Sequence, residues 1–110
     1  MVEFFSSGSK HEYANFKKNI PKQIIPLFDK LRSFCNSLDE KVIEDVRMHR
    51  VVFCKSMKFR WFADLEPTQT SILIKIQKDR KIPIKTIEVF PNQNITSVQN
   101  FLKDAYSSIH

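Results

Sequence analysis

Apolar residues in the N-terminal half of the chain recur with the spacing of an α-helix. Between residues 22 and 38 they fall on a single helical stripe, the arrangement of a helix that buries one face. Pro21 and Pro26 stand at its start, where proline is tolerated. The stripe consists of Ile24, Leu27, Phe28, Leu31, Phe34, Cys35 and Leu38.

A second helix is expected directly after the first. Ser37 and Glu40 have the spacing of a capping box, in which two side chains satisfy free backbone N–H groups at a helix N-terminus. Three apolar residues follow between positions 42 and 46. The pattern therefore predicts two helices with a short break over residues 22–47.

The hydrophobic period changes from 3.6 to 2 after residue 47, which is typical of β-strands. Four segments have this pattern, with polar or proline-containing turns between them; residues 56–58 are expected to form the first turn, a hairpin. In the second segment, strict alternation places Trp61 toward the core and Phe62 on the outward face beside Arg60, with burial of Phe62 under a helix or in a dimer interface as the alternative. The segments are residues 49–56, 59–66, 72–77 and 84–90.

The end of the chain is helical again. Thr96 and Gln99 form a second capping box, and apolar residues follow on one face as far as Ile109. This order predicts an α+β fold in two layers: a four-stranded antiparallel sheet with the helices packed on one face. A single domain is expected over residues 11–110, with a helical turn near its start, after a flexible lead-in of residues 1–10.

Composition excludes several classes of protein. The chain of 110 residues has a single glycine, Gly8, so neither a P-loop nor a dinucleotide-binding fingerprint can be present. No apolar run approaches the roughly 20 residues of a membrane span. No secretory signal is recognisable, so Cys35 and Cys54 are expected to be reduced core residues and the protein to be cytoplasmic.

Charge is the strongest functional signal. Residues 46–87 carry ten of the eighteen Lys and Arg residues but three of the twelve acids, a net charge of +7 on the expected sheet. A basic sheet with an exposed aromatic ring suits a nucleic-acid backbone and its bases, so we predict a nucleic-acid partner. The predicted binding residues are Arg47, Arg50, Lys58, Arg60, Lys75, Lys78 and Lys81, with Phe62 stacking on bases.

Two non-catalytic alternatives stay open. The lysines and arginines can serve solubility, since charge on edge strands and loops blocks aggregation. The outer face or an edge strand of the sheet can instead bind a protein partner or a second copy of the chain, as a homodimer.

The sequence gives little support for a catalytic function. No His or Cys pair has the spacing of metal ligands, and neither a metal nor a cofactor is expected. Asp64 and Glu66 share one face of a strand and could hold Mg²⁺ in a hydrolase. The next strand, however, lacks the acid and the correctly spaced lysine of restriction-type nucleases, so a hydrolase is a lesser alternative to a binding module.

Several segments together resemble a known family. The matching residues are 25–28, 38–40, 46–47, 62–67 and 101–106. In these the chain is similar to a domain of unknown function that forms the C-terminal module of bacterial and archaeal proteins labelled predicted transport proteins, and that accompanies restriction-type nuclease domains. The resemblance covers residues 24–107, with a shorter segment, 79–83, where the family has a longer glycine-containing one. It implies an accessory role beside nucleic acid and carries no known activity.

Overall fold

The computed structural model describes residues 12–56 and 60–109. The expected lead-in of residues 1–10 and most of the hairpin turn at residues 56–58 lie outside them. The helices are α1 (Tyr13–Lys17), the single 3₁₀ turn η2 (Lys22–Ile24), α2 (Ile25–Ser37) and α3 (Thr96–Ser108). The strands are β1 (Val42–Val46), β2 (Val51–Lys55), β3 (Trp61–Pro67), β4 (Ile72–Ile76) and β5 (Lys85–Val89).

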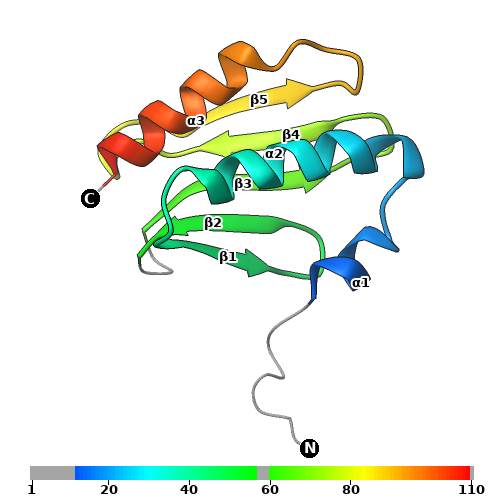
Figure 1. Ribbon diagram of the computed structural model, residues 1–110. Coiled ribbons are helices and arrows are strands. Elements are labelled where there is room, and N and C mark those ends of the chain that lie inside the picture. The colour runs from blue at the N-terminus through cyan, green and yellow to red at the C-terminus, as the bar shows by residue number, and fades with distance from the viewer. Residues whose placement is uncertain (1–11, 57–59, 110) are drawn as a thin grey trace, which may run out of the picture.

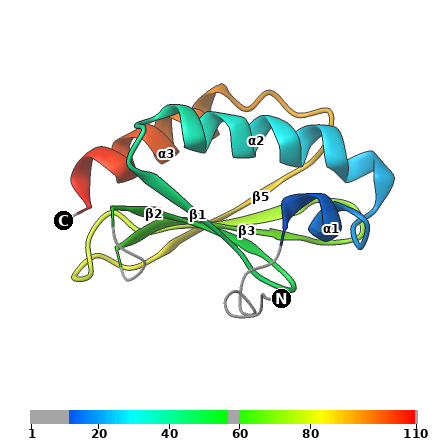
Figure 2. The ribbon, with the colours of Figure 1, turned by 60° about the horizontal axis from the view of Figure 1, so that its bottom comes forward.

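The strands form one antiparallel sheet in which each strand lies next to its neighbour in sequence. Helices α2 and α3 lie side by side over one face of this sheet (Figures 1 and 2). The predicted α+β class and the two layers are therefore confirmed. The sheet has five strands, whereas the sequence predicted four.

The additional strand is β1, in the segment that the sequence assigned to a second helix. That prediction is wrong: Val42 pairs with Lys55, and Val46 with Val51. The segment is rich in β-branched residues, which fit a pleated strand better than a helix. Ser37 does not cap a helix either, since its hydroxyl donates to the carbonyl oxygen of Phe34.

Helices α2 and α3 follow their predicted stripes. In α2 the buried residues include Phe28 and Leu31, and in α3 they include Leu102 and Ala105. The predicted capping box at Thr96 is not formed: Thr96 is the first helical residue, and its N–H donates to the side-chain oxygen of Asn94.

One row of paired residues defines the inner face of the sheet. Val46, Val51, Leu65, Ile74 and Ile87 lie opposite one another across the five strands and pack in the core beneath the helices. The next row points the other way, because side chains alternate along a strand. That outer row consists of Asp45, Val52, Asp64, Lys75 and Thr86.

The two cysteines are both buried. Cys35 lies in the core beneath α2, and burial raises the pKa of its thiol. Cys54 was expected in the core as well. It is fully buried, but it pairs across the sheet with Ile43 and Trp61 in a row of the outer face.

A β-bulge reverses the expected orientation of two aromatic residues in β3. Phe53 lies opposite Ala63, whereas the next residue, Cys54, lies opposite Trp61, so Phe62 is an extra residue in β3. Phe62 turns inward, is fully buried and packs edge-on against Tyr106 of α3, with ring centroids 5.3 Å apart. Trp61 lies on the outer face instead. The prediction of an outward Phe62 beside Arg60 is therefore wrong.

Tyr106 also connects α3 to the segment between α2 and β1. Its hydroxyl donates to Asp39 Oδ2 at 2.6 Å. This hydrogen bond, together with one from the Lys41 N–H, holds the pKa of the Asp39 carboxyl below its usual range. Burial, and then the same bond, raise the pKa of Tyr106 to about 12.

Tyr106→Phe is expected to raise the pKa of Asp39 toward that of a free aspartate. Because the folded-state pKa of Asp39 is depressed, its contribution to stability is present above the unfolded pKa of about 3.9 and is lost as the pH falls through the folded pKa. The difference in melting temperature between wild type and variant should therefore shrink between neutral pH and about pH 3. Carboxyl NMR titration of Asp39 measures the shift, and an unchanged pKa in the variant would contradict this role of Tyr106.

Candidate anion-binding site

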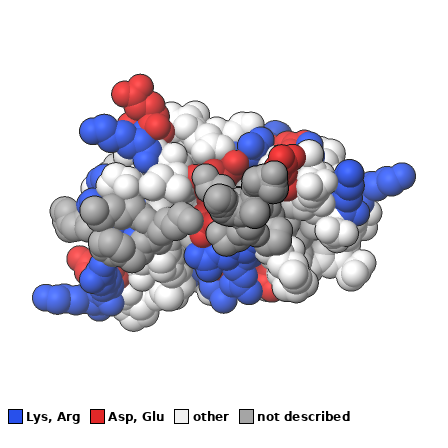
Figure 3. All heavy atoms as spheres, turned by 90° about the horizontal axis from the view of Figure 1, so that it is seen from below, with Lys and Arg blue, Asp and Glu red and all other residues white. Residues whose placement is uncertain are grey.

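The outer face of the sheet is not the continuous basic surface that the sequence predicted. Arg50 lies 3.0 Å from Asp64 and 3.3 Å from Glu66, and Arg47 lies 3.0 Å from Asp45. Each arginine thus has a carboxylate neighbour that neutralises its charge. On the edge of the molecule formed by β1, basic and acidic side chains are likewise interspersed (Figure 3).

The ion pairs of Arg50 also involve the two carboxylates of the hydrolase alternative. Asp64 and Glu66 do share the outer face, and Arg50 bridges both of them. Within residues 12–56 and 60–109, no group of three or more His, Cys, Asp or Glu side chains could hold a metal ion. The pair of carboxylates is occupied by an arginine in this structure.

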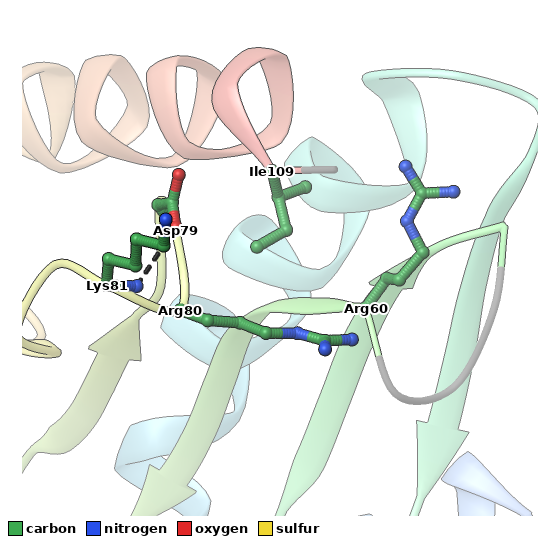
Figure 4. Close-up of a pocket in the computed structure, with 5 residues that line it drawn as sticks. All are labelled: Arg60, Asp79, Arg80, Lys81 and Ile109. Carbon is green, nitrogen blue, oxygen red and sulfur yellow. Dashed lines mark hydrogen bonds between the residues drawn. The ribbon is translucent and has the colours of Figure 1, made fainter.

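At one end of the sheet, in contrast to its outer face, several cationic side chains line a hollow. There the start of β3, the loop joining β4 to β5 and the C-terminal end of α3 meet, at the left of Figure 1. The hollow has a volume of about 310 Å³. It is lined by Arg60, Asp79, Arg80, Lys81 and Ile109, which we call the basic end (Figure 4).

Arg60 is held in place by the segment that precedes β3. Its carbonyl oxygen accepts a hydrogen bond from the Lys55 N–H at 2.9 Å, and its Nη1 donates to the Ser56 hydroxyl at 3.1 Å. Ser56 has a φ of 62°, in the left-handed region that is unfavourable for a residue with a Cβ. The Arg60 Nε is buried and has no hydrogen-bond partner. One donor of the guanidinium is therefore unused.

The loop between β4 and β5 supplies the other two cations. Gln77 fastens the start of this loop to β3, because its side chain donates to the Trp61 carbonyl oxygen at 3.0 Å. Asp79 then shapes the turn by accepting the N–H of Lys81 at 2.9 Å. Arg80 and Lys81 are exposed, and the Arg80 side chain extends toward the strand that carries Arg60 (Figure 4).

Two further lysines near this end have structural partners. Lys55 Nζ donates to the carbonyl oxygens of Tyr106 and Ile109, at the C-terminal end of α3, where the helix dipole favours a cation. Lys78 lies 2.6 Å from Asp104 of the same helix. They connect the sheet to α3.

The predicted binding residues thus separate into groups. Arg60 and Lys81 come together at the basic end, and Lys75 lies in the outer row of the sheet. Arg47, Arg50 and Lys78 form ion pairs, and Phe62 is buried. Lys58 lies outside the described residues.

The predicted set of binding residues left out Asp79, Arg80 and Ile109, and it took Phe62 rather than Trp61 as the outward ring. Arg80 belongs to the same basic segment as Lys81, so charge alone could have indicated it. The position of Ile109 follows from the packing of α3 and has no local signal.

Comparisons with protein-family models, with curated proteins and with solved structures found no match to this chain. Across the described part of the chain, no helix is both long enough and apolar enough to cross a membrane.

Proposed function

We propose that this protein is a small, cytoplasmic, non-catalytic module that binds the backbone of single-stranded nucleic acid through its basic end. The observation that carries the proposal is that Arg60, Arg80 and Lys81 line one hollow. Guanidinium and ammonium groups are the usual protein partners of phosphate oxygens. A phosphate group is therefore the ligand that this chemistry fits best.

The arrangement of charge supports an anionic ligand over a neutral one. Among the residues that the structure describes, Asp79 is the one carboxylate that lines the hollow, and its Oδ1 is bound to the Lys81 N–H of its own loop. The buried Nε–H of Arg60 has no hydrogen-bond partner, and a movement of the side chain that exposes it would let it donate to a phosphate oxygen. The resemblance to a domain that accompanies nucleases adds a setting for such a module, by analogy alone.

Binding through the basic end should depend steeply on salt. Three phosphate contacts on a single strand correspond to a slope of log affinity against log salt of about −2, so affinity should fall roughly 15- to 20-fold between ~50 and ~200 mM salt. Fluorescence anisotropy of a labelled single-stranded oligonucleotide measures both quantities. A dissociation constant that does not change with salt, or no binding even at low salt, would contradict the proposal.

A second candidate function is self-association along β5. Four large apolar side chains on or near this edge strand are 39–49% exposed: Ile82, Ile84, Phe90 and Phe101. An edge strand with exposed apolar neighbours is a surface on which a second copy of the chain can pair. Molar mass measured by light scattering at several concentrations distinguishes this function, since a backbone-binding monomer keeps one mass throughout.

A further inference from the structure

A second hollow lies on the outer face of the sheet, beside the basic end. Its volume is about 240 Å³. We propose that it holds one unstacked base of the strand whose phosphates bind at the basic end, and that it prefers bases with an exocyclic amino group. This inference rests on the proposed function. The hollow is lined by Arg47, Val52, Trp61, Asp64, Lys75 and Ile84.

The two hollows are neighbours along two segments of the chain. Arg60 lines the first hollow, and the next residue, Trp61, lines the second. Similarly, Lys81 lines the first and Ile84, three residues further along the same loop, lines the second. Because successive side chains of a strand face opposite sides, the two hollows lie on either side of the end of the sheet, and a nucleic-acid strand bound at the basic end reaches the second hollow around that end.

Trp61 gives this space an aromatic wall. The β-bulge that buries Phe62 turns the half-buried indole of Trp61 outward. Stacking on aromatic side chains is the usual way in which proteins hold unpaired bases, and it tolerates every base because each has a π-face. Trp61 can therefore take the role that the sequence assigned to Phe62, but it does not by itself select a base.

Asp64 supplies the selectivity. Its Oδ2 accepts a hydrogen bond from Arg50 at 3.0 Å, whereas its Oδ1 is buried and has no partner. A buried acceptor without a donor is unfavourable, so a ligand that brings an N–H group to it gains a hydrogen bond. Because Asp64 Oδ1 is buried, the side chains that cover it must move outward before a ligand can donate this hydrogen bond.

The chemistry of the bases then sets the preference. Cytosine presents its N4 amino group as a donor to a carboxylate, whereas thymine and uracil carry a carbonyl oxygen at the same place. A carbonyl oxygen facing Asp64 Oδ1 would bring two acceptors together. Lys75, a cation that also lines the hollow, suits the carbonyl oxygen of cytosine or the neighbouring phosphate.

Trp61 is the only tryptophan of the chain, so its fluorescence reports on the hollow directly. Wild-type protein is titrated with oligo-dC and oligo-dT of equal length, at neutral pH and low salt, and both anisotropy and tryptophan emission are recorded. We expect both strands to bind and to quench Trp61, with oligo-dC bound about fivefold to tenfold more tightly because of one additional hydrogen bond.

Different results would contradict the base site and the backbone-binding function. Equal affinity for the two strands, or salt-dependent binding without any change in Trp61 emission, would overturn the base site and leave the backbone-binding function standing. No binding of either strand would overturn both. The comparison needs no variant, so it does not depend on whether a substituted protein folds.

A matched pair of variants then tests whether Asp64 causes the preference for oligo-dC. Asp64 and Glu66 both bind Arg50, but only Asp64 lines the hollow. Asp64→Asn should abolish the preference for oligo-dC, whereas Glu66→Gln should retain it, with folding of both checked by circular dichroism. Loss of the preference in Glu66→Gln but not in Asp64→Asn would overturn the assignment.

Discussion

Phe62→Ala is expected to lower the free energy of unfolding by about 3–5 kcal/mol. Phe62 is fully buried, belongs to the core between sheet and helices, and packs edge-on against Tyr106. Truncation removes the apolar packing of the ring, including the part that connects β3 to α3, and leaves a cavity. Chemical denaturation, with the dependence of unfolding on denaturant fitted for both proteins, measures the difference.

Phe90→Ala is the matched control for this prediction. The side chain is also a phenylalanine ring, but it is 46% exposed, so its truncation should change the free energy of unfolding by no more than about 0.5 kcal/mol. If Phe62→Ala proved as stable as Phe90→Ala and instead lost affinity for oligonucleotides, the inward orientation of Phe62 would be wrong.

The double variant Arg60→Gln, Lys81→Gln is expected to bind single-stranded oligonucleotide at least about tenfold more weakly than wild type. It removes two of the three cations that line the basic end while preserving most of the length of each side chain. The salt dependence should also become shallower, by about 0.7 for each phosphate of a single strand that the variant no longer neutralises. Anisotropy titrations at several salt concentrations give both values.

A control with the same change in net charge distinguishes this site from general electrostatic attraction. Lys18 and Lys22 are exposed and belong to the α1–η2 region, at the far end of the sheet from the basic end (Figure 1). Lys18→Gln, Lys22→Gln should bind within about twofold of wild type. Equal losses in the two double variants would mean that net charge, and not the basic end, determines affinity.

The long helices were predictable because their signal is local and repeated. The stripe of α2 extends over four turns, and few other structures would bury it. The segment of β1 is five residues long, and its apolar positions fit a helix face as well as one side of a strand. Its pairing with β2 decides the outcome, and pairing between segments is not visible in a local pattern.

The orientation of the aromatic residues in β3 could not be predicted for a different reason. Side chains alternate along a strand, so a single extra residue reverses every assignment on one side of it. The bulge at Phe62 has no glycine or proline to indicate it. Sequence reasoning therefore identified the right strand but placed Trp61 and Phe62 on the wrong faces.

The candidate site was predicted only in part, because the tertiary structure decides whether a charged side chain has an oppositely charged neighbour. Arg50 and Asp64 are 14 residues apart and meet across neighbouring strands. A count of basic residues treats Arg50 and Arg60 alike, although one is paired and the other lines a hollow. The net charge of the segment thus indicated an anionic partner without locating where it binds.

The phosphates of a bound oligonucleotide are expected at the basic end and not at the opposite end of the sheet. The most direct test is a titration of ¹⁵N-labelled protein with a single-stranded oligonucleotide, followed by ¹H–¹⁵N correlation spectra. We expect the largest shifts at the amides of Arg60 and of the loop around Arg80 and Lys81. Shifts confined to α1 and the start of α2, or none at saturating oligonucleotide, would contradict this expectation.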